Sequence, residues 1–217
     1  MLKKIFVRRE CVHLGLAALT WTLWHGAHAQ DYLFTTLNDD VGLPSNNIRG
    51  ICIDADGYVW FAGDAGLRRY DGLNFRIFTR NAGDHLTLTR SQFGEMAIAP
   101  NGLLWMTRLY GLAVYSPYTG GFRIFSPDYT VRKKLTIDCV AVDSSGTVWG
   151  GTLEGLVRKK RNENSFAFIP TPAPVNCIAV LRNGEIWLGT EGKGPMRLEG
   201  ETVVPLFDEK VASENKV

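Results

Sequence analysis

Short stretches of alternating apolar and polar residues, separated by turns rich in glycine, aspartate and asparagine, recur four times along the chain. Each repeat centres on a tryptophan with a glycine three residues before it and an aliphatic residue directly before it. The tryptophans lie 45, 44 and 38 residues apart, and the four pairs are Trp60 with Gly57, Trp105 with Gly102, Trp149 with Gly146, and Trp187 with Gly184. A period of about 40–50 residues built from short strands is typical of a β-propeller with one repeat per blade.

The first repeat shows how one blade is built. β-rich runs at 48–54, 58–63, 67–70 and 75–79 alternate with turns that carry glycine, which favours a four-stranded antiparallel meander. The sequence therefore predicts an all-β fold, a β-propeller with four four-stranded antiparallel blades. The blades are expected at about residues 43–79, 88–126, 135–169 and 174–207.

The first strand of every repeat has one bulky and one small face. Positions nine and seven before the tryptophan carry Ile, Met or Val, whereas the position between them carries Cys52, Ala97, Ala141 or Ala179. Because alternate side chains lie on opposite faces of a strand, we expect a large face to nest on the small face of the next blade. The four tryptophans and their four glycines are then structural core of the repeat and not platforms for a ligand.

Residues 1–29 have the features of a secretory signal peptide. Lys3, Lys4, Arg8 and Arg9 precede an apolar run from Cys11 to Trp24, and Ala27-His28-Ala29 is an A-x-A cleavage site. The alternative, an uncleaved anchor, is disfavoured because the run is shorter than the roughly 20 residues that a membrane span needs. Export to the periplasm is predicted, with a propeller domain at 30–217.

Charge and cysteine content narrow the class of protein further. Without the leader, 20 basic residues face 21 acidic ones, which argues against nucleic acid as a partner. The exported part holds Cys52, Cys139 and Cys177, an odd number. Cys139 and Cys177 hold the same position in neighbouring repeats and so should not face each other, and buried free thiols are predicted.

The two ends of the chain do not match a closed ring. Residues 32–35 resemble a lone fourth strand, although the fourth repeat already has one, and 213–217 resemble the entry to the first repeat at 45–48. We therefore expect a fragment or an early-terminated reading frame, an incomplete part of a larger ring. A natural four-bladed ring is the alternative. In a fragment, uncovered strand edges and blade faces would make self-association possible.

Few residues suggest chemistry. His85 is the one histidine outside the leader, and Asp54, Asp56, Asp64 and Asp71 are spaced as turn formers and not as a calcium loop. No catalytic residue, metal site or cofactor is predicted. Five polar residues are expected at one mouth of the ring: Asp64, Arg108, Tyr110, Glu154 and Lys193. Arg108 and Tyr110 are the candidate ligand contacts, and ordinary solvated loop residues are the alternative.

Residues 42–72 resemble the repeat of two-component-regulator propellers. The matching features are the Gly-Leu-Pro-Ser-Asn-Asn entry, D-x-D-G-x-V-W, and Gly-Leu-x-x-Tyr; Gly-Thr pairs at 151–152 and 189–190 complete the pattern in later repeats. The resemblance implies a non-catalytic sensor domain of an inner-membrane receptor. It also implies the remaining blades of a seven-bladed ring and a downstream histidine kinase or diguanylate cyclase as partners, and a small-molecule or glycan ligand. An exported propeller enzyme of the lyase or lactonase type, and a protein-interaction scaffold, are the alternatives.

The leader generates the first testable prediction. Expression with export should yield a chain that starts at Gln30, because cleavage follows Ala29. Intact-mass measurement of the periplasmic protein checks this. A mass that includes Met1 to Ala29 would contradict it.

Overall fold

The computed structural model describes residues 36–37, 47–64, 66–78, 93–108, 110–126 and 136–207. The chain divides into two compact units, Met1–Thr36 and Leu37–Val217. The predicted leader, the strand expected at 32–35, His85 and the last ten residues lie outside the described residues. All strands named below belong to the second unit.

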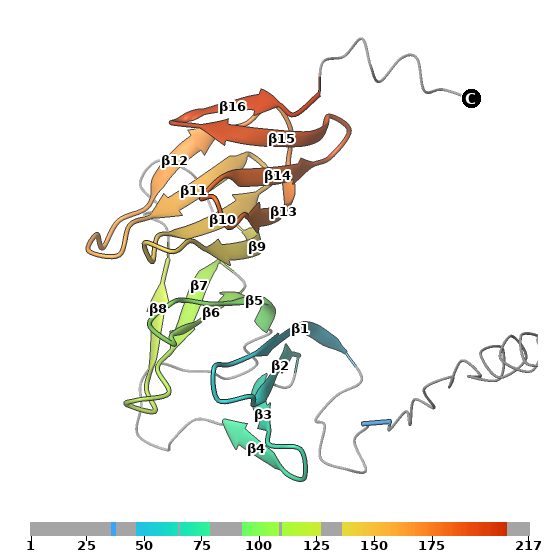
Figure 1. Cartoon of the computed structure of the whole chain (residues 1–217), viewed down its shortest axis with the longest axis vertical. Helices are drawn as coiled ribbons and strands as arrows, with labels where there is room; N and C mark the ends of the chain where they lie inside the picture. Colours follow the sequence, from blue (N-terminus) through green and yellow to red (C-terminus); the bar gives the residue numbers. More distant parts are fainter. Residues whose placement is uncertain are drawn as a thin grey trace, which may run out of the picture. The chain divides into compact units, whose positions relative to one another are not determined.

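The described residues form four four-stranded sheets, each with its strands antiparallel and in chain order (Figure 1). The first contains β1 (Ile48–Ile53), β2 (Val59–Gly63), β3 (Gly66–Tyr70) and β4 (Phe75–Phe78). The second contains β5 (Phe93–Ile98), β6 (Leu104–Arg108), β7 (Gly111–Tyr115) and β8 (Phe122–Phe125). The third contains β9 (Ile137–Val142), β10 (Val148–Thr152), β11 (Gly155–Lys159) and β12 (Ala167–Pro170). The fourth contains β13 (Val175–Val180), β14 (Ile186–Thr190), β15 (Gly194–Glu199) and β16 (Thr202–Pro205). Among these residues no helix is long and apolar enough to cross a membrane.

The turn between the first two strands of a blade also holds the tryptophan. Asp54 accepts hydrogen bonds from the backbone N–H of Tyr58 (2.9 Å) and, through its other oxygen, from Trp60 Nε1 (2.7 Å). Asp143 repeats this with Thr147 (3.0 Å) and Trp149 (2.9 Å) in the third sheet. Gly57 has a φ of 85°, a conformation that glycine adopts without steric cost. One carboxylate therefore closes the turn and orients the indole.

Consecutive sheets pack face to face through their first strands, β1 on β5, β5 on β9, and β9 on β13. The approach is close: a Cβ at Gly50 on β1 would lie 2.5 Å from the Gly94 carbonyl and 2.9 Å from Met96 Cγ on β5. The small face of each sheet thus lies on the bulky face of the sheet that follows it. The expected pairing of large with small is present, but its direction along the chain is the reverse of the one predicted.

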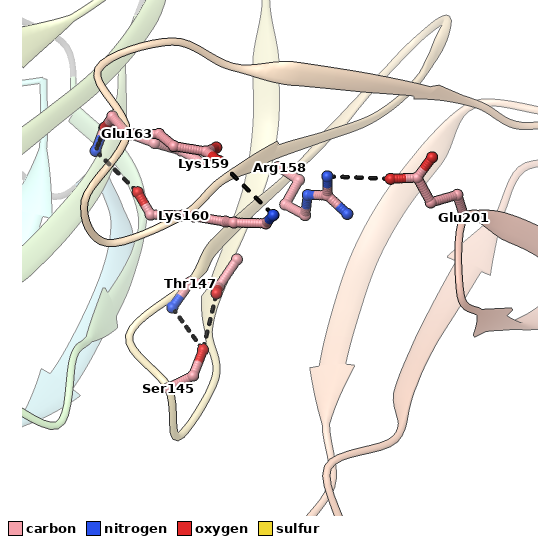
Figure 2. Close-up of polar contacts among 7 residues, drawn as sticks. All are labelled: Ser145, Thr147, Arg158, Lys159, Lys160, Glu163 and Glu201. Atoms are coloured by element: carbon pink, nitrogen blue, oxygen red, sulfur yellow. Dashed lines mark hydrogen bonds and ion pairs between the residues drawn. The ribbon is translucent and has the colours of Figure 1, made fainter.

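Each of the first three tryptophans is buried between its own sheet and the next. Trp60 is 0% exposed and packs with Met96 and Leu104 of the second sheet. Trp105 lies in a cluster with residues of the third sheet, and Trp149, 6% exposed, lies in a cluster with residues of the fourth. An ion pair between Arg158 on β11 and Glu201 (3.1 Å) also joins the third and fourth sheets (Figure 2). Trp187, on the fourth sheet, is only partly buried.

Two sheet faces are uncovered in the described part of the chain. On the bulky face of β1, Ile51 is 60% and Ile53 66% exposed. On the small face of β13, Cys177 and Ala179 are exposed. The bulky face of the first sheet and the small face of the fourth sheet are therefore exposed to solvent. The corresponding faces of the second and third sheets are buried.

The three cysteines are free thiols. Cys139 is buried between the third and fourth sheets, with Sγ 3.6 Å from the Val175 carbonyl, and burial raises its pKa to about 12, which keeps it protonated and unreactive. Cys52 is partly buried. The prediction of burial is wrong for Cys177, because it lies on the uncovered face of the fourth sheet.

The packing of the tryptophans predicts unequal costs of truncation. Trp149→Ala should lower the free energy of unfolding by about 3–5 kcal/mol, because the ring fills the space between two sheets. Trp187→Ala is the matched control and should cost clearly less, since no sheet covers that face in the described structure. Urea unfolding measures both. Equal losses would contradict this account of the packing.

Candidate functional site

A cleft lies where the first three sheets meet, at the ends of β6 and the starts of β1, β5 and β9. Its volume is about 180 Å³. The lining combines two guanidinium groups, a carboxylate and two threonines around a glycine; the residues are Arg49, Arg108, Asp138, Thr107, Thr136 and Gly94, with Ile137. We refer to it as the mouth cleft.

Arg108 ends β6 and lies at the position held by Gly63, Thr152 and Thr190 in the other sheets. Each threonine hydroxyl donates to a backbone carbonyl of the following turn, Thr152 to Gly155 at 2.8 Å and Thr190 to Gly194 at 2.7 Å. Arginine does not make that short bond. Its Nε is buried without a hydrogen-bond partner, as are those of Arg68, Arg158 and Arg197, and among these four arginines Arg108 is the one that lines this cleft.

The turn after Arg108 is strained. Tyr110 has a φ of 63°, the one positive φ of a residue other than glycine in the described part of the chain. Such a conformation costs roughly 1–2 kcal/mol in an L-residue. Tyr110 does not line the mouth cleft, so the structure separates the two predicted ligand contacts: Arg108 lies at the cleft and Tyr110 on the adjoining turn.

Charges around the cleft are only partly compensated. Arg49 donates to Asp64, with Nε 3.1 Å from Oδ1, so this aspartate positions a cleft residue. Desolvation by the surrounding protein raises the pKa of Asp138, and no ion pair to Asp138 is present among the described residues. Desolvation also raises the pKa of Glu95, which accepts the Val140 N–H at 3.0 Å and so ties the second sheet to the third.

Two residues of the cleft, Arg49 and Asp138, were not expected from the sequence. Both lie eleven residues before the tryptophan of their repeat, where the other repeats have Gly94 and Asn176. The position eleven residues before the tryptophan is therefore polar in three of the four repeats, although the rest of this strand is mostly apolar. This pattern could have predicted Arg49 and Asp138 as site residues. Glu154 and Lys193, which were expected at the mouth, are on the exposed turns of the third and fourth sheets and do not line the cleft.

The arrangement is suited to holding a ligand. Guanidinium groups and hydroxyls bind hydroxylated or anionic molecules, and one carboxylate can accept from a ligand hydroxyl. Within the described residues no group of three or more His, Cys, Asp or Glu side chains could hold a metal ion. The cleft offers no pair of side chains arranged as nucleophile and base.

Comparison with known proteins identifies the repeat. Residues 42–65 match the family model described as "Two component regulator propeller". The chain carries the repeat of this family. The resemblance seen at 42–72 is thereby confirmed, as is the prediction of an all-β chain made of four-stranded blades. No curated protein matches the chain in sequence.

Several solved structures share the fold of this chain. The extracellular domain described as that of a hybrid two component system, BT4673 from B. thetaiotaomicron, is 21% identical, with a TM-score of 0.57 over 69% of this chain. PorZ, a surface component of the type-IX secretion system of Porphyromonas gingivalis, is 18% identical, with a TM-score of 0.61 over 82%. Catalytically inactive virginiamycin B lyase from Staphylococcus aureus is 16% identical, with a TM-score of 0.61 over 80%.

The chain spans a minor or moderate part of each of these proteins. It covers 21% of the B. thetaiotaomicron domain, 30% of PorZ and 58% of the lyase. At these identities the likeness shows the fold, which an extracellular domain of a two component system, a secretion-system component and a lyase all share.

Two aspartates should respond to pH in opposite directions. Because the pKa of Asp138 is raised, its ionised form is disfavoured in the folded protein, and Asp138→Asn should increase the free energy of unfolding at pH 7. The gain should be about 0.5 kcal/mol or less, since Asp138 is exposed and solvent screens its charge. It should disappear as the pH falls through the raised pKa.

Asp143→Asn is the control with the opposite sign. Burial acts to raise the pKa of Asp143, but hydrogen bonds from Ser145, Trp149 and the backbone outweigh it and hold the pKa below its usual value. Asp143 therefore stabilises the fold above the pKa of an unfolded aspartate, and its replacement should cost about 1 kcal/mol at pH 7. The two variants are compared by denaturant unfolding at pH 7 and pH 4. Changes of the same sign would refute the assignment.

Proposed function

We propose that the chain is a non-catalytic, ligand-sensing propeller that works outside the cytoplasm as part of a transmembrane signalling receptor. The ligand, a hydroxylated small molecule or glycan, binds in the mouth cleft. Arg108 supplies an unused donor, Thr107 and Thr136 supply hydroxyls, and Asp138 accepts from the ligand. The receptor carries the signal to a histidine kinase or diguanylate cyclase domain.

The observation that carries this proposal is the family repeat together with the composition of the cleft. The repeat belongs to two-component-regulator propellers, and the mouth cleft contains Arg108, which replaces the threonine that ends the second strand of the third and fourth sheets. A donor left unused in a buried position costs free energy in the empty protein. A ligand acceptor that satisfies it recovers that free energy, which favours binding.

Further blades of the same receptor are the partners we propose for the uncovered faces of the first and fourth sheets. Ile51 and Ile53 are exposed on the bulky face of the first sheet. The corresponding face of the second sheet carries Met96, which is buried against the first sheet. Trp187 lies on the face of the fourth sheet that corresponds to the face of the first sheet that carries Trp60. Where no blade covers these faces, self-association of the chain is the expected consequence.

A propeller enzyme is the second candidate, because virginiamycin B lyase and a gluconolactonase described from its structure share the fold. Against it, the sequence after the leader contains one histidine, His85, which lies outside the described residues. General acid–base chemistry needs titratable groups placed within hydrogen-bond reach of the reacting atoms. The mouth cleft supplies one carboxylate.

Binding without turnover distinguishes the two functions. The chain is mixed with a panel of defined di- and trisaccharides, binding is followed by thermal shift and calorimetry, and each sugar is examined by ¹H NMR after incubation. We expect at least one sugar to bind, to be recovered unchanged, and to lose about tenfold or more in affinity with Arg108→Gln, as for a lost charge-assisted hydrogen bond.

Arg182→Gln is the matched control, since Arg182 is an exposed residue on a turn of the fourth sheet. It should leave the affinity unchanged. New product signals in the NMR spectra would favour the enzyme. Binding that is equally strong in Arg108→Gln would remove the mouth cleft from the proposal.

A further inference from the structure

The interface between the second and third sheets differs from the two other interfaces of the described chain. In the first and third sheets the tryptophan indole donates to Asp54 or Asp143, six residues earlier. In the second sheet that position is Ala99. In the described residues no side chain accepts a hydrogen bond from Trp105, and its N–H is not among the buried polar atoms that lack a partner. This indole N–H is therefore available from the open side.

The neighbour of the tryptophan on the third strand has changed as well. Trp60, Trp149 and Trp187 each pair across the sheet with an arginine, namely Arg69, Arg158 and Arg197. Trp105 pairs with Val114. The shorter side chains at Ala99 and Val114 no longer fill the space beside the indole.

A lysine of the third sheet lies beside the indole instead. Lys159, on β11, has the position that Tyr115 and Leu198 have on the second and fourth sheets. It is 4% exposed. Its Nζ lies 4.6 Å from the centre of the Phe125 ring and 5.6 Å from that of Trp105. Where Trp60, Phe78 and Tyr115 form an aromatic cluster in the preceding interface, a lysine here faces two aromatic rings.

The Lys159 ammonium has two backbone hydrogen-bond acceptors and, among the described residues, no ion pair with a carboxylate. It donates to the Glu163 carbonyl at 2.7 Å and, more weakly, to that of Lys160 at 3.5 Å (Figure 2). The Glu163 carboxylate itself pairs with the Lys160 side chain at 3.7 Å. Burial, and secondarily the charge of Arg123, lower the pKa of Lys159, while Glu163 acts in the opposite direction. A buried cation without a paired anion is costly, and an anion that enters reduces that cost.

These changes leave a cleft of about 380 Å³ between the two sheets, within the range of small-molecule sites. Three cations line it, Arg123, Lys159 and Arg161, and no acid does. Apolar and aromatic side chains form the rest of the wall, among them Trp105, Phe125 and Leu103. A second hollow of about 200 Å³ shares Leu103, Trp105, Lys159 and Arg161 with this cleft and is also lined by Ala99, which replaces the usual acceptor of the indole N–H.

We propose that this cleft binds a small carboxylate carried on a ring. The carboxylate accepts from Lys159 Nζ and from the Trp105 indole N–H, and the exposed guanidinium groups of Arg123 and Arg161 attract it. The ring lies against Phe125 and Leu103, since flat rings pack favourably on aromatic side chains. The site is separate from the mouth cleft and shares no lining residue with it.

The test uses two carboxylates, benzoate and glucuronate, and their neutral analogues, benzamide and glucose. Indole N–H signals of the ¹⁵N-labelled chain are followed by NMR, with the Trp105 signal assigned from Trp105→Phe. We expect at least one carboxylate to shift the Trp105 signal with saturation and to leave the Trp149 signal unchanged. The two carboxylates distinguish an aromatic ring from a sugar ring. The neutral analogues should give at most about a tenth of the affinity, because the charge-assisted bonds are lost.

Ala99→Asp is the decisive variant. It restores the residue found in the first and third repeats, so its carboxylate should take the Trp105 N–H and lie beside Lys159. The variant should be at least as stable as the parent chain, yet lose about tenfold or more in affinity for the carboxylate. Lys159→Met should lose affinity similarly, and its thermal unfolding reports whether the fold survives.

Two matched controls complete the design. Lys160→Gln removes the exposed neighbouring charge, and Arg108→Gln alters the mouth cleft; both should keep the affinity within about twofold of the parent. The proposal is overturned if neither carboxylate shifts the Trp105 signal at millimolar concentration, if the neutral analogues bind equally well, or if Ala99→Asp binds as the parent does. None of these results bears on the mouth cleft, whose own test uses Arg108→Gln.

Discussion

The contact on which this fold depends is the burial of an indole ring between two successive sheets. A four-stranded meander has two faces and can cover neither by itself, so each blade gains stability from its neighbours. The small residues beside each tryptophan, such as Cys52 and Ala141, let the next sheet approach closely, and the ring fills the wider space beyond them. An aspartate in the preceding turn accepts the indole N–H in two of the sheets, so that a polar atom in a nearly dry interface is satisfied.

The same contact explains where the chain can vary without losing its fold. Between the second and third sheets the indole remains buried, but its acid has become Ala99, its arginine neighbour has become Val114, and a lysine faces it from the other sheet. Packing still closes the interface near the first strands. Beside the indole, the shorter side chains of Ala99 and Val114 leave a cleft. Lys159 lines this cleft and has no ion pair among the described residues. The repeat therefore tolerates a site at one interface because its other interfaces keep the standard set of residues.

Strand ends and interfaces carry different kinds of site. The mouth cleft is built from residues at the ends of β1, β6 and β9, where the turn can change without disturbing the layer beneath. Arg108 shows this: it gives up the hydroxyl that closes the turn in later repeats, and the strained turn at Tyr110 follows it. The fold class does not determine the function, since an extracellular domain of a two component system, a secretion-system component and a lyase all have structures similar to this one. Both proposed binding sites therefore rest on the side chains at these two positions and not on the fold class.

The sequence by itself determined the blade plan of this protein. Period, turn glycines and the alternation of large and small residues are local signals, and they predicted four four-stranded antiparallel sheets and marked Arg108 as a departure from the repeat. The tertiary structure decided what local signals do not contain. It set the direction in which small faces meet bulky ones, exposed Cys177, brought Arg49 and Asp138 to Arg108, and placed Lys159 over Trp105 from a different repeat. Those outcomes depend on which sheet faces which, because residues 30 or more positions apart meet only when the sheets stack.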